Sequence, residues 1–158
     1  MAGQDDIRTT AEAHEEAALP QARVALVDPG APRTAEQKPL PSAVARKPLQ
    51  EKSPAEWAYE RLILYIQNFE EQLDSEHEIA MGFAGSDTGV MRIEGVGFFD
   101  PDIVTFYGCD ESGAKTQLVQ HVTQLNVMLR ALPKQAPEEA PARIGFRLVA
   151  DLEQEAAS

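Results

Sequence analysis

The chain has 158 residues and a formal net charge of −12, and its length indicates one domain rather than several. An acidic chain repels phosphate groups, which argues against binding to nucleic acid or to anionic membranes and leaves a protein partner or self-association as the expected contact. The single cysteine, Cys109, excludes an intramolecular disulfide, and the absence of an apolar leader or membrane-length apolar run predicts a cytoplasmic protein.

Residues 1–52 are predicted to form a disordered tail. They contain six prolines between Pro20 and Pro48 and none of the aromatic residues, so they can bury little apolar surface. One short apolar run, Val24, Ala25, Leu26 and Val27, interrupts this composition. It is either a docking motif that pairs with a sheet edge or a transient apolar spot in a linker.

The predicted domain spans residues 53–151 and begins with a helix. Ser53 at the N-cap, Pro54 at the first helical position and Glu56 three residues after the cap form a capping box. Apolar residues then recur every three or four positions, which is the spacing of one helical face. They are Ala58, Leu62, Tyr65, Ile66, Phe69 and Leu73. The helix is expected to end near Leu73.

A four-stranded antiparallel meander is predicted next. Alternating apolar residues and β-prone runs indicate strands near residues 79–83, 90–99, 103–109 and 115–120. Glycine-rich, proline-containing or Asp-rich turns separate them at residues 85–89, 100–102 and 110–113. The glycines fall within and between strands, so they do not form a phosphate-binding loop, and Gly95 and Gly97 indicate a bulge or a close approach of another segment.

The period changes after the fourth strand. Leu118, Val122, Leu125, Leu129 and Leu132 follow helical spacing, which predicts a second helix from about residue 122 to 132. Alternation over residues 144–149 predicts a fifth strand, and residues 152–158 are expected to form a disordered C-terminal tail. The fold class is therefore α+β. An Sm-like fold also combines an N-terminal helix with five strands, but the expected second helix and a charge of −11 over residues 51–158 argue against it.

The candidate site lies at one end of the sheet. Asp100 and Asp102 lie in the turn before the third strand, and His121 ends the fourth, so Asp102 and His121 are expected to touch. A carboxylate that orients an imidazole is a common catalytic element, and it is equally a common surface ion pair.

Other pairings of reactive side chains are disfavoured by distance. In the predicted hairpin, Cys109 and His121 are separated by about 16 Å along the strands, too far for a nucleophile–base pair. His77 and His121 lie on the first and fourth strands, about 14 Å apart, so they do not share a metal. We therefore predict neither a metal nor a cofactor.

The predicted register gives the sheet two apolar faces. One face is expected to carry Ile79, Met81, Phe83, Val96, Phe98, Ile103, Tyr107 and Leu118, and the other Met91, Ile93, Phe99, Val104, Phe106 and Val119. Two short helices can cover one face, so the other is expected to be covered by the neighbourhood of the fifth strand, by the tail or by another subunit, and an exposed apolar face of this kind indicates an interface.

Four sequence runs resemble an uncharacterised bacterial family, domain-of-unknown-function family 6173. The runs lie at residues 53–62, 106–108, 118–126 and 143–146, and the likeness spans about residues 53–149. The resemblance implies the domain boundary and a bacterial, cytosolic context. That family has no established activity, so it implies no functional residues.

These observations favour a non-enzymatic protein-interaction or oligomerisation module. The alternative is a small enzyme or ligand-binding domain with its site near Asp100, Asp102 and His121. A third hypothesis is an adaptor that recruits a partner through Val24–Val27.

Overall fold

The computed structural model describes residues 20–83 and 89–157. Its longest helix, α3 (Pro54–Glu71), begins where the sequence predicts and ends two residues before Leu73. The Ser53 side chain accepts a hydrogen bond from the Glu56 N–H at 3.0 Å, which is one half of the predicted capping box. The Glu56 carboxylate does not complete the box but lies 2.9 Å from the Lys47 ammonium.

The four-stranded meander is confirmed. It consists of β1 (His77–Phe83), β2 (Val90–Phe99), β3 (Ile103–Cys109) and β4 (Lys115–His121), all antiparallel to their neighbours. A fifth strand, β5 (Val127–Pro133), pairs with the free side of β1, and the strand order is β4-β3-β2-β1-β5. The chain is therefore α+β, as predicted.

The elements after β4 differ from the prediction. Residues 122–132 do not form a helix: a short 3-10 turn, η3 (Val122–Gln124), leads into β5. Residues 144–149 do not form a strand, because Gly145–Ala157 is a helix, α4. The missing helix removes one of the two arguments against an Sm-like arrangement, while the negative charge remains.

The predicted division of the sheet into two faces was wrong. Met81 pairs with Met91, and Val96 pairs with Phe106, so these four side chains share the inner face. One cause is a β-bulge between Ile93 and Gly95, near the predicted position, which places Val96 on the same face as Met91 and Ile93. A shift of one residue moves every later side chain to the other face of the sheet.

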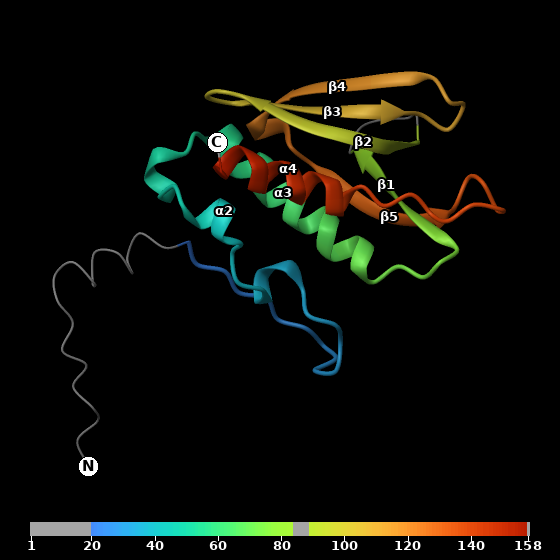
Figure 1. Cartoon of the computed structure of the whole chain (residues 1–158), viewed down its shortest axis with the longest axis horizontal. Helices are drawn as coiled ribbons and strands as arrows, with labels where there is room; N and C mark the ends of the chain where they lie inside the picture. The colour runs from blue at the N-terminus through green and yellow to red at the C-terminus, as the bar shows by residue number, and fades with distance from the viewer. Residues whose placement is uncertain (1–19, 84–88, 158) are drawn as a thin grey trace, which may run out of the picture.

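Helices α3 and α4 lie side by side over the inner face of the sheet (Figure 1). The core between them is built from buried residues of both layers, namely Leu62, Ile63, Ile66, Ile79, Met81, Met91, Ile93, Val104, Phe106, Leu148 and Leu152. The Phe83 and Phe106 rings meet edge-on in this core, with 5.1 Å between their centroids.

The expected tail boundaries also change. The segment before α3 contains η1 (Ala35–Gln37), α2 (Ser42–Ala45) and η2 (Leu49–Glu51), and Val44 is 1% exposed within the core. At the other end, Leu152 is 6% exposed in α4, although residues 152–158 were expected to be a disordered tail. The packed region therefore begins before residue 53 and extends beyond residue 151.

The segment Val24–Val27 belongs to no strand, so it does not pair with a sheet edge in this structure. Leu26 and Val27 are exposed, which leaves the docking role a prediction. Among the described residues, none of the helices has the length and apolar character that a membrane crossing requires.

Candidate functional site

The structure brings two of the three predicted site residues together. The His121 Nε2 atom lies 2.9 Å from Asp102 Oδ2, as the hairpin register predicted. Asp100 lies nearby in sequence but faces the start of α3, where its carboxylate accepts a hydrogen bond of 2.6 Å from the Ser53 hydroxyl. Asp100 therefore anchors the helix start to the β2–β3 turn.

Both ring nitrogens of His121 already have partners. The backbone N–H of Thr123 donates to Nδ1 at 3.1 Å, so the proton belongs on Nε2, which donates it to Asp102. The Thr123 hydroxyl also lies 2.7 Å from Nδ1, and the side chain of His121 caps η3. A general base needs a free lone pair facing its substrate. This arrangement is that of a helix cap whose Nε2–H donates a hydrogen bond to a carboxylate.

The disfavoured pairings remain apart. In the β3–β4 register, Cys109 pairs with Lys115 and Ile103 pairs with His121, which places Cys109 and His121 at opposite ends of the hairpin. His77 lies on β1, three strands from β4. Its own partner is Asp74, 2.7 Å from Nδ1. Within residues 20–83 and 89–157, His, Cys, Asp and Glu side chains form no group of three that suits a metal ion.

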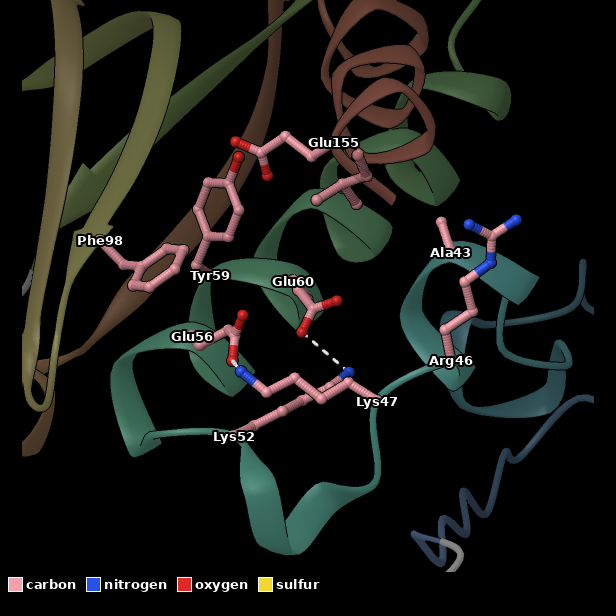
Figure 2. A pocket seen from close by; sticks show the side chains of 10 residues that line it. Ala43, Arg46, Lys47, Lys52, Glu56, Tyr59, Glu60, Phe98 and Glu155 are labelled. Carbon is pink, nitrogen blue, oxygen red and sulfur yellow. Dashed lines mark hydrogen bonds and ion pairs between the residues drawn. The ribbon is translucent and has the colours of Figure 1, made fainter. Parts of the chain in front are cut away.

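A second polar cluster, which sequence reasoning missed, lines a cavity of about 350 Å³ between α2, α3 and α4. Figure 2 shows two ion pairs within it: Lys52–Glu60 and Lys47–Glu56, each with 2.9 Å between nitrogen and oxygen. The Lys52 and Glu60 side chains are almost completely buried. Lys52 also donates to the carbonyl oxygen of Val44, so it joins α2 to α3.

Burial shifts the pKa of two side chains that line this cavity, Glu60 and Tyr59. Burial raises the pKa of Glu60, and the neighbouring Lys52 opposes the rise. Burial, aided by the charges of Glu155, Asp151 and Glu60, raises the pKa of Tyr59 to about 12. The Tyr59 ring packs on Phe98 with 5.0 Å between centroids. Three acidic and three basic residues are found in the described lining of the cavity, so these charges balance. Such balance suits a cross-link between helices better than a charged ligand.

A third feature is the outer face of the sheet over β2, β3 and β4. Phe99, Tyr107 and Val119 are 76%, 43% and 59% exposed there. Large apolar side chains gathered on one face of a sheet are characteristic of an interface. A Cβ at Gly97 would lie 2.6 Å from the Thr105 hydroxyl of the neighbouring strand, so a side chain rather than a close backbone approach accounts for that glycine.

The sequence carried no signal for the Lys52–Glu60 pair. These two residues stand eight positions apart, and only the turn of η2 into α3 brings them together. The alternation of apolar residues along the strands did indicate an exposed apolar face. Which residues of β2 lie on that face, however, depended on the bulge next to Gly95.

The fold and these features define an α+β domain with two helices over one face of a five-stranded antiparallel sheet. A family model described as a family of unknown function, DUF6173, matches residues 49–147, more than half of the chain. The chain belongs to this family, which confirms the resemblance seen in its sequence. None of the curated proteins or solved structures matches it.

Proposed function

We propose that this chain is a non-enzymatic self-association module that pairs with a second copy along strand β4. The observation that carries the proposal is the combination of a free strand edge with an exposed apolar face beside it. Among the described strands, β4 pairs only with β3. The exposed residues Val119 and Tyr107 lie on β4 and on the strand next to it.

The edge of β4 lacks the features that keep strand edges from pairing. Proteins protect such edges with proline, bulges or inward-pointing charges. The β4 sequence, Lys-Thr-Gln-Leu-Val-Gln-His, has none of these, and its one lysine is at its end. Pairing with a second strand would satisfy the backbone N–H and C=O groups that point away from β3.

The local charge of β4 suits a second copy. The chain carries a net charge of −12, yet β4 contains no acidic residue. If two β4 strands pair antiparallel about Leu118, Lys115 of one copy lies opposite His121 of the other. Asp102, which is bonded to His121, then offers a carboxylate to that lysine at each end of the ladder.

Light scattering over a concentration series tests the proposal, and we expect a dimer. Val119→Lys should shift the mass to the monomer, because it places a charge beside the centre of the paired edge. Phe146→Lys is the matched control, since Phe146 is an equally apolar, 75% exposed residue on α4. A monomeric wild-type chain, or equal effects of the two substitutions, would contradict the proposal.

Disulfide formation tests the register. In a Cys109→Ser background, Gln117→Cys and Val119→Cys chains produced in the same cells should cross-link to each other. Directly opposed residues have Cα atoms about 5 Å apart, within disulfide reach. Either variant alone should not cross-link, because its two copies lie diagonally. A dimer that cross-links with Gln117→Cys alone would retain self-association but exclude this pairing.

The second candidate is a small enzyme or ligand-binding domain with its site at the sheet end, where Asp102 contacts His121. His121→Ala separates the two: lost ligand binding with unchanged stability favours the second candidate, and a purely structural effect favours the first. In either case the single free cysteine agrees with our proposal of a cytoplasmic protein. A partner role for Val24–Val27 predicts that alanine substitutions there abolish partner capture without altering the fold.

A further inference from the structure

A groove lies between the N-terminal segment and α3. Its volume is about 750 Å³, and it continues into a hollow of about 230 Å³. The two share an apolar wall of Pro20, Leu40, Ala45, Leu49 and Trp57. Small-molecule sites have this character: a mostly apolar wall of a few hundred Å³ with a few polar groups.

The charge of the groove is opposite to that of the whole chain. Among the described residues that line it, Arg23, Lys38 and Arg61 stand against one acid, Glu36. The adjoining hollow adds Arg46, Lys47 and Lys52, with no acidic residue among its described lining. The net charge of −12 attracts cations to the chain as a whole, whereas this local group of basic side chains attracts anions. The ligand that this groove suits is therefore an anion.

Two arginines are placed to hold that anion. Lys38, Lys47 and Lys52 already face carboxylates of Glu71, Glu56 and Glu60. Arg23 and Arg61, by contrast, make no ion pair among the described residues. The Arg61 guanidinium stacks on the Tyr65 ring, 4.9 Å from its centroid. An arginine stacked in this way keeps its N–H edge available for a carboxylate.

We propose that this groove binds a small carboxylic acid with an apolar, aromatic body. The body lies against Trp57 and Leu40, and Arg61 and Arg23 hold the carboxylate. The charge-balanced cavity on the other side of Lys52 does not suit such a ligand, since its acids and bases already pair. This site is separate from the strand edge proposed for self-association.

The groove contains its own reporter. Trp57 is the only tryptophan in the chain and lines the groove, so its emission reports occupancy directly. The probes are 3-phenylpropanoate, its neutral amide and 3-phenylpropylamine, which share one body and differ in charge. We expect saturable changes of emission with the carboxylate and affinity at least about tenfold weaker for the amide, the loss expected when a charged hydrogen-bonding partner is removed. The amine should not bind.

Substitutions in the full chain complete the test. Arg61→Gln and Arg23→Gln should each weaken carboxylate binding, by about tenfold for the stacked Arg61. Arg147→Gln, an equal charge change on the exposed side of α4, should leave it unchanged. Urea unfolding of each variant verifies the fold. Should Arg61→Gln prove unstable, Arg23→Gln still tests the proposal, because Arg23 lies outside the helices. Equal binding of the three probes, no saturable binding of the carboxylate, or equal affinity in Arg23→Gln and Arg147→Gln would overturn the proposal.

Discussion

Replacing Glu70 should reveal how the two helices are joined. Glu70 is 5% exposed near the end of α3. Its carboxylate accepts hydrogen bonds from the backbone N–H groups of Ile144 at 3.0 Å and Gly145 at 2.5 Å. These groups begin α4, whose own first turn contains no acidic residue. Glu70 therefore caps α4 from another helix and places negative charge at its positive end.

The expected cost follows from the two bonds. In Glu70→Ala both N–H groups lose their partner, at roughly 1–3 kcal/mol each, and we expect about 3 kcal/mol of lost unfolding free energy. We expect less than the combined upper limit for two lost hydrogen bonds, because removing the carboxylate also removes an unfavourable charge: burial raises the pKa of Glu70. Glu70→Gln keeps one acceptor and should lose about half as much.

Urea unfolding monitored by circular dichroism measures these differences by linear extrapolation. Glu71→Ala is the matched control, since Glu71 is the neighbouring residue, half exposed, with a surface ion pair to Lys38. Such a pair contributes about 0–1 kcal/mol. If Glu70→Ala is no more destabilising than Glu71→Ala, the capping of α4 by α3 is refuted.

Three further predictions concern the packing of the domain, and urea unfolding measures each. Gly108→Ala should lower the unfolding free energy by about 3 kcal/mol or more, because the new Cβ would lie 2.0 Å from the Arg92 carbonyl oxygen. Gly95→Ala is the control: the nearest atom to its Cβ would be 3.6 Å away, so stability should change by less than about 1 kcal/mol. Equal effects of the two substitutions would contradict this prediction. Val44→Ala should cost about 2 kcal/mol, since two methyl groups leave the core, and a neutral effect would show that the N-terminal segment is not packed there. Burial raises the pKa of Glu60, so the folded protein keeps a proton on this carboxyl at pH values where the unfolded chain has lost it. The unfolding free energy should therefore rise as the pH falls from neutral towards 4.5, the ordinary pKa of a glutamate. Glu60→Gln should show a smaller rise, and an identical pH profile would exclude this contribution.

The sequence by itself determined the parts of the fold that depend on local interactions. The start of α3 follows from Ser53 and Pro54, whose cap and fixed φ act within one turn. The meander follows from alternation between short turns, where each strand pairs with its neighbour in the chain. The contact of Asp102 with His121 also follows, because the hairpin places the start of β3 opposite the end of β4.

Only the tertiary structure decided the elements whose local patterns were ambiguous. The apolar spacing of residues 125–132 suits a helix or a strand, and the free side of β1 selects the strand by offering seven residues to pair with β5. Alternation over residues 144–149 suggested a strand. The distant Glu70 carboxylate caps a helix there, and Leu148 and Leu152 bury themselves in the core. Glu70 lies some seventy positions before the residues that it caps, so it leaves no trace in the sequence pattern around them. Local patterns therefore could not identify α4.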